Sequence, residues 1–127
     1  MKLWVDDLRP APEGYCWVKS VNEAKDRIER QEKLFDSACN QARFHMFNDN
    51  YQFVEEYLKE SEEVKVELID LDHDAGDFAS DGGDYIRLLD WLEETGRDYP
   101  IHIHSANPVG IANMRRIIKR NDWEEVK

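Results

Sequence analysis

Short apolar runs that end in polar, chemically capable residues are the feature that most constrains this fold. Residues 2–5 run into Asp6-Asp7, residues 64–71 into Asp72-His73-Asp74, and residues 101–104 into Ser105-Ala106-Asn107. Runs of this length are typical of buried strands. Since ligands bind at the carboxyl ends of strands in an open parallel sheet, we expect these groups to share one rim. We assign two further polar stretches, residues 81–84 and 113–116, to the same rim.

The order of elements predicts an α/β fold. We expect strands at residues 2–5, 15–19, 64–71 and 101–104, and a capping box formed by Ser20 and Glu23 that begins a helix over about 21–31. Further helices are expected at about 51–60, from Tyr85 to about Gly96, and from about Gly110 onward. Strands that alternate with helices predict a central parallel sheet of four to five strands with helices on both faces.

Length, charge and apolar content exclude several classes of function. A chain of 127 residues suits one domain. Because 17 basic residues face 28 acidic ones, the net charge of −11 argues against extended nucleic-acid binding. Cys16 and Cys39 are isolated and indicate reduced thiols, and no segment approaches the ~20 apolar residues of a membrane span. We expect a cytoplasmic protein with a small phosphate-containing substrate and no membrane association, and leave a protein partner open.

Three aspartates are candidate metal ligands. Two adjacent acids at one strand end and a third at a neighbouring strand end form the oxygen site that Mg²⁺ prefers, which makes Asp6, Asp7 and Asp72 the metal candidates. An isolated Asp-Asp pair more often solvates a strand end, but the second acid cluster favours a site. Asp70 lies two residues from Asp72 and is the lesser candidate, because it is further from the strand end.

Two histidines and a polar loop supply the remaining candidates. His73 and His104 can exchange protons near neutral pH, although each could equally be structural. Ser105 and Asn107 can donate hydrogen bonds to a phosphoryl oxygen, and the start of the last helix, from Gly110 to Asn113, can add backbone N–H groups. The alternative for this loop is a turn that caps the helix.

These strings resemble a known family. Residues 3–10 (LWVDDLRP), 71–74 (LDHD), 83–85 (GDY), 104–110 (HSANPVG) and 113–114 (NM) are similar to response-regulator receiver domains, and more closely to their cyclic-phosphate-processing relatives. The resemblance implies a three-layer, flavodoxin-like fold over residues 1–127, with residues 33–62 as a helical insertion. It also implies that Asp6 and Asp7 hold Mg²⁺, that Asp72 corresponds to the phosphoacceptor aspartate, and that Ser105 contacts a phosphoryl oxygen.

The chain departs from ordinary receivers in two ways. It ends soon after residues 115–120 without the lysine that follows a fifth strand in receivers, with only residues 123–126 left for such a strand. It also carries His73, Asp74, His104 and Asn107, which a phosphoacceptor switch does not require. Catalysis explains these four residues better than signalling does.

The leading hypothesis is a Mg²⁺- or Mn²⁺-dependent phosphoesterase that hydrolyses cyclic phosphates derived from nucleotides or RNA ends. Asp6, Asp7 and Asp72 hold the metal in this reading, and Asp72, His73, His104 and Ser105 are the catalytic residues. Ser105, Asn107 and Asn113 bind phosphate. Whether Asp72 is a metal ligand only or a nucleophile stays open. The alternatives are a catalytically inactive receiver-like binding module and a phosphoacceptor switch.

Overall fold

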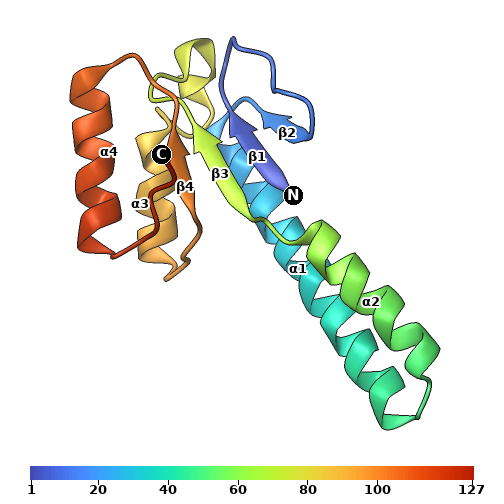
Figure 1. The fold of residues 1–127 in the computed structure, drawn as a ribbon. Helices are drawn as coiled ribbons and strands as arrows, with labels where there is room; N and C mark the ends of the chain where they lie inside the picture. Colours follow the sequence, from blue (N-terminus) through green and yellow to red (C-terminus); the bar gives the residue numbers. More distant parts are fainter.

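A computed structural model describes all residues 1–127. Its sheet contains β1 (Lys2–Val5), β2 (Tyr15–Val18), β3 (Leu68–Leu71) and β4 (Ile101–Ile103), all parallel, in the order β2-β1-β3-β4. The helices are α1 (Val21–Phe47), α2 (Tyr51–Val64), α3 (Ile86–Glu94) and α4 (Pro108–Arg120), with the short 3₁₀ helix η1 (Gly76–Ser80) after β3. The predicted receiver-like α/β fold with a parallel sheet is confirmed (Figure 1).

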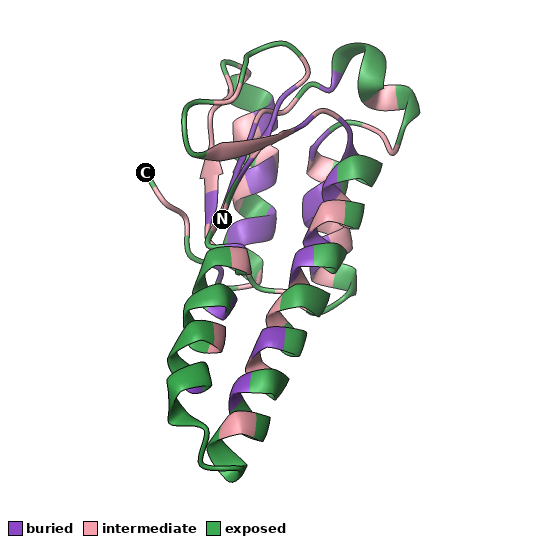
Figure 2. Cartoon of the chain, turned by 90° about the vertical axis from the view of Figure 1, so that its right-hand side faces the viewer, coloured by how far each residue is buried: buried purple, intermediate pink, exposed green.

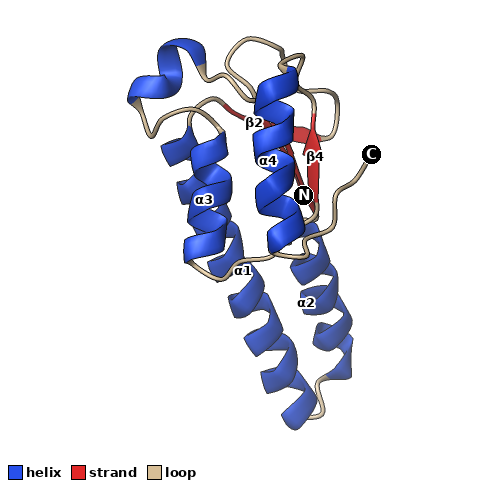
Figure 3. Ribbon diagram, turned by 90° about the vertical axis from the view of Figure 1, so that its left-hand side faces the viewer, coloured by secondary structure: helices blue, strands red, loops and turns tan.

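The core lies on one face of the sheet. Leu3 and Val5 of β1 are fully buried and pack in one cluster with strand residues of the same face and with apolar residues of α1, α3 and α4. The intervening residues of the strands, such as Trp4, belong to the opposite face and are absent from that cluster. Figure 1 shows α1 and α3 behind the sheet, and Figure 3 shows α3 and α4 side by side.

The expectation of helices on both faces therefore does not hold. After β2 the chain moves across the sheet in one direction, through α1 and α2 to β3 and through α3 to β4. Right-handed crossovers in one direction place their helices on the same face. Only the connection from β1 back to β2 runs the other way, and residues 6–14 make it as a loop that contains no helix. The opposite face is left without a helical layer.

The predicted helix over 21–31 is too short, because α1 continues to Phe47 and forms an antiparallel hairpin with α2. The inward positions of α1 recur at alternating spacings of three and four residues, the pattern of packed helices. They are Val21, Ala24, Ile28, Gln31, Phe35, Ala38, Ala42 and His45. The first three contact the sheet core. Gln31 donates to the Val64 carbonyl and the His45 ring stacks on Tyr57, so the later part of α1 packs on α2. Figure 2 shows buried positions on the sides of the two helices that face each other. Residues 33–62 are thus mostly helical.

The strand expected over 64–71 begins only at Leu68, because α2 extends to Val64. The last helix begins at Pro108 instead of Gly110, with Asn107 as its N-cap. Residues 123–126 do not form a full fifth strand. They make one parallel bridge to Ile101, whose N–H donates to the Glu124 carbonyl and whose carbonyl accepts from the Val126 N–H. No helix has the length and apolar character needed to cross a membrane.

The hairpin packing generates a prediction. Ala42 is almost fully buried on the α2-facing side of α1, whereas the next residue, Arg43, is exposed. Ala42→Asp places an unpaired charge in that contact, a change that costs several kcal/mol. We expect hydrogen exchange to show lost amide protection in residues 38–60 with β1 and β3 still protected. Arg43→Asp is the control, and equal protection in both variants would contradict the packing.

Candidate functional site

Three carboxylates meet at the carboxyl end of the sheet. Asp6 and Asp7 follow β1, and Asp72 follows β3, with which β1 pairs in parallel register. One oxygen atom from each of these aspartates lies within 4.8 Å of the others. The backbone of Gly76, at a φ of +55°, approaches Asp7 so closely that a Cβ atom there would collide with the Asp7 carboxylate. The parallel strands therefore bring together the three predicted metal ligands.

The two neighbouring aspartates differ in electrostatics. Burial acts to raise the pKa of Asp6, which is 1% exposed, but hydrogen bonds from the Arg9 and Leu8 amides and from the His104 ring lower it below the ordinary value. The pKa of Asp7 is raised, first by burial and then by the charges of nearby carboxylates, Asp6 and Asp72 among them. Asp6 is thus a stabilised anion, while the charge on Asp7 is disfavoured unless a cation offsets it.

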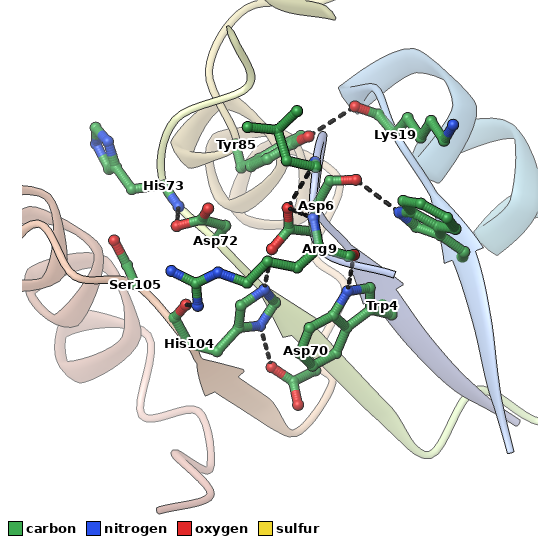
Figure 4. A network of polar contacts seen from close by, with 12 residues as sticks. Trp4, Asp6, Arg9, Lys19, Asp70, Asp72, His73, Tyr85, His104 and Ser105 are labelled. Atoms are coloured by element: carbon green, nitrogen blue, oxygen red, sulfur yellow. Dashed lines mark hydrogen bonds and ion pairs between the residues drawn. The ribbon is translucent and has the colours of Figure 1, made fainter. Parts of the chain in front are cut away.

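His104 lies between two buried acids (Figure 4). Its Nε2 atom is 2.8 Å from Asp6 Oδ2, and its Nδ1 atom bonds Asp70 Oδ1. The ring stacks on the Trp4 indole with centroids 3.8 Å apart. Burial acts to lower the pKa of His104, but the hydrogen bonds and charges of Asp70 and Asp6 outweigh it and raise the pKa overall. Both ring nitrogens are engaged, so this imidazole fixes the orientation of Asp6.

His73 takes a different position. Its backbone N–H donates to Asp72 Oδ1, but Figure 4 shows its ring pointing away from Asp72. The ring packs against the backbone of Gly110 in α4, where a Cβ atom would overlap it. Its Nδ1 atom is 3.0 Å from Asp74 Oδ1 and 3.5 Å from Asn107 Nδ2. His73 therefore lies beside the acid cluster without facing it.

A hollow of about 350 Å³ opens beside the carboxylates. Its lining residues come from three strand ends and are Arg9, Asp72, Asp74, Ser105, Ala106 and Asn107. The Ser105 hydroxyl accepts from the Asn107 N–H, and the Asn107 side chain accepts from the Gly110 N–H as the α4 cap. The hollow thus combines a carboxylate, a guanidinium, a hydroxyl and an amide, a set that suits a phosphate held next to a cation.

Some predicted residues lie elsewhere. The side chain of Asn113 accepts from Arg116 within α4 and does not line the hollow. The amides at the start of α4 are partly used by its own cap, because both Gly110 and Ile111 donate to Asn107. In the 81–84 stretch, Asp81 accepts from Ser20 and Asn22 at the start of α1. Asp84 accepts from the Ala75 N–H. Residues 81–84 therefore stabilise the loop between β3 and α3 and do not contribute to the acid cluster.

Sequence reasoning undervalued three site residues. Asp70 is 5% exposed and bonds the His104 ring, so it positions this histidine within the site. The sequence did contain a signal for Asp70. It lies two residues before Asp72, and residues at that spacing share one face of a strand. Arg9 lines the hollow and donates from Nη1 to the His104 carbonyl. Trp4 pairs with Asp70 across β1 and β3, but only the fold reveals that its ring supports His104.

The His104 network makes stability depend on pH. A raised pKa means that the folded protein holds the His104 proton more tightly than the unfolded chain does. This contribution is complete below the ordinary histidine pKa of about 6.5 and is lost as pH rises through the higher folded-state pKa. In urea unfolding with EDTA, we expect the stability difference between the protein and His104→Gln to shrink as pH rises from 6 to 9. A constant difference would contradict this network.

The acid cluster makes a second prediction. Because the charge on Asp7 is disfavoured in the folded protein, Asp7→Asn should raise the melting temperature in EDTA at pH 7 by a few degrees. Adding Mg²⁺ should stabilise the parent protein more than the variant and reduce this difference. Asp26→Asn, at an exposed position of α1, is the control. Identical Mg²⁺ responses in the parent and Asp7→Asn would argue against a metal site.

Comparison with known proteins shows the family of this chain. No curated protein and no solved structure matches the chain. The sequence model of one family, the cyclic-phosphate processing receiver domain, matches residues 1–39 and 36–120. These segments include the strand ends that carry the acid cluster, His104 and Ser105. The resemblance seen in the sequence is confirmed, and the chain belongs to the family of cyclic-phosphate processing receiver domains.

Proposed function

We propose that this receiver-like domain is a divalent-metal-dependent phosphoesterase that hydrolyses cyclic phosphates from nucleotides or RNA ends. The observation that carries the proposal is the placement of three carboxylates within 4.8 Å of one another, beside a hollow that Arg9, Ser105 and Asn107 also line. An oxygen site next to hydrogen-bond donors can hold a phosphate through both its charge and its geometry.

The donor set fits Mg²⁺ or Mn²⁺. Asp6, Asp7 and Asp72 supply hard oxygen ligands, and the unfavourable charge on Asp7 is the charge that a cation would offset. When bound, such an ion supplies Lewis acidity toward a phosphoryl oxygen and lowers the pKa of a coordinated water.

The chain's own residues orient the substrate. The Arg9 guanidinium lines the hollow and offers a positive charge to a phosphoryl oxygen. The Ser105 hydroxyl and the side-chain NH₂ group of Asn107, which also line the hollow, offer neutral donors. Because these groups are held by the strand ends and the α4 cap, they stabilise developing charge with little rearrangement.

The two histidines receive separate roles. His104, with both nitrogens bound to acids, is the positioning residue that holds Asp6. His73 is the better group for proton transfer, because its ring contacts Asp74 and Asn107, two residues that line the hollow. A rotation of this side chain is needed to reach a substrate oxygen. Asp72 acts as a metal ligand, or as a nucleophile if an aspartyl-phosphate forms.

One observation favours a second candidate function. Neither histidine presents a free ring nitrogen toward Asp72 in this structure, since His104 is bound on both sides and His73 points away. A receiver-like domain that binds a cyclic phosphate or a partner protein without hydrolysing it fits that arrangement. Both functions include binding of a ligand, but only the proposed activity includes hydrolysis of a cyclic phosphate.

Hydrolysis of a panel of 2′,3′-cyclic and 3′,5′-cyclic nucleotides, followed by chromatography with Mg²⁺, Mn²⁺ or EDTA, tests the proposal. We expect metal-dependent turnover that falls at least about 100-fold in Asp72→Asn and about tenfold or more in Ser105→Ala, because these changes remove charge stabilisation. Asp98→Asn, an exposed acid at the opposite end of the sheet, is the matched control and should retain full activity. Absence of turnover with intact nucleotide binding would support the binding module.

A further inference from the structure

The helix-free face of the sheet carries aromatic side chains. In the strand register Trp4 lies opposite Trp17, and Lys2 lies opposite Tyr15. These positions alternate with the core residues of β1 and β2, so their side chains leave the sheet on the opposite side. All three aromatic residues remain partly exposed, and the rings of Trp4 and Tyr15 meet edge to face with centroids 5.8 Å apart. We call Trp4, Tyr15 and Trp17 the aromatic face.

Cations accompany these rings in a strongly acidic chain. The Lys19 Nζ atom lies 4.4 Å from the centroid of the Trp17 ring, and the Lys2 Nζ atom lies 5.5 Å from that of Tyr15. Asp70, the acid that the register places beside Trp4, is already paired with His104. Two ammonium groups therefore lie over the rings of the aromatic face, although the whole chain has a net charge of −11. These ammonium groups complement an anion, and the rings complement an aromatic group.

The aromatic face adjoins the hollow through one residue. The Trp4 indole N–H donates to the Arg9 carbonyl at 2.9 Å, while the Arg9 guanidinium lines the hollow with Asp72 and Ser105. Figure 4 shows Arg9 lying between Trp4 and Ser105. A molecule whose phosphate occupies the hollow can thus extend past Arg9 onto Trp4 and its neighbours.

We propose that the aromatic face binds the nucleobase of the substrate, which makes this a site for nucleotides and not for sugar phosphates. This inference rests on the proposed function. Stacking of a base on aromatic side chains requires no particular base, and the adjacent lysines can move from the rings toward the phosphate. The face spans only two strands, and the net charge disfavours a long nucleic-acid chain, so the expected ligand is a single nucleotide.

Binding of two matched ligands tests the inference. Adenosine 5′-monophosphate and ribose 5-phosphate carry the phosphate on the same ribose carbon, but only the first has a base. We expect the adenosine compound to bind at least about tenfold more tightly in calorimetry, the value that one stacked base supplies. In NMR spectra it should move the indole N–H signals of Trp4 and Trp17. The signals of Trp91 and Trp123, which pack with the helices on the other side, should stay in place.

Variants make the test independent of folding effects. Trp17→Ala should weaken binding of adenosine 5′-monophosphate about 5- to 100-fold, and Trp17→Phe should restore most of the affinity. Binding of ribose 5-phosphate should weaken far less, although Trp17→Ala also removes the indole hydrogen bond to the Asp6 carbonyl. Trp91→Phe is the matched control. If Trp17→Ala fails to fold, two measurements still test the inference. They are the affinity of Lys19→Gln for the adenosine compound, which should fall, and the indole N–H signals of the parent protein.

Failure of this inference differs from failure of the proposed activity. Equal affinity for the two ligands, or nucleotide-induced shifts only at Trp91 and Trp123, would overturn the role of the aromatic face even if cyclic phosphates are hydrolysed. Base-dependent binding with the expected shifts would support it even if the hydrolysis panel shows no turnover, because these ligands are bound and not cleaved.

Discussion

The ion-paired contact of His104 with Asp6 and Asp70 is the interaction on which the site depends. It joins β1, β3 and β4, because Asp6 follows β1, Asp70 lies in β3 and His104 follows β4. Two buried acids beside each other would repel, and the imidazole between them removes that repulsion only while it carries its proton. The Trp4 ring covers the imidazole and excludes water from one side. The sheet therefore orients Asp6, which is one of the three candidate metal ligands.

Much of this fold could be predicted from the sequence. The apolar runs located all four strands, and their polar ends identified Asp6, Asp7 and Asp72, because parallel strands align their carboxyl ends. The helix-free face was harder to foresee, since it depends on the order in which strands pair. The order of elements did contain a clue. No helical pattern separates β1 from β2, where Pro10 and Pro12 interrupt the chain.

The role of each histidine could not be predicted in the same way. In sequence His73 and His104 look alike, since each lies just after a strand and beside a polar residue. In the fold the His104 ring lies between two acids and the His73 ring packs on Gly110. These positions depend on contacts between strands that are far apart in the sequence. The continuation of α1 beyond residue 31 could not be predicted, because small and polar residues occupy the side of this helix that faces α2. Gln31, Ala38 and Ala42 are buried in α1, but they contribute little to an apolar signal.

The length of α1 has a mechanical consequence. One continuous helix anchors its first turns in the sheet core at Val21 and Ile28 and carries its last turns far outside that core. From Ile28 to Phe47 the rod measures roughly 28 Å at 1.5 Å per residue. A tilt of about 5° at its anchored base moves its free end by roughly 2.5 Å. The hairpin is thus a lever whose tip amplifies small motions of the sheet, and whose base begins at Ser20, which bonds the loop after β3 through Asp81.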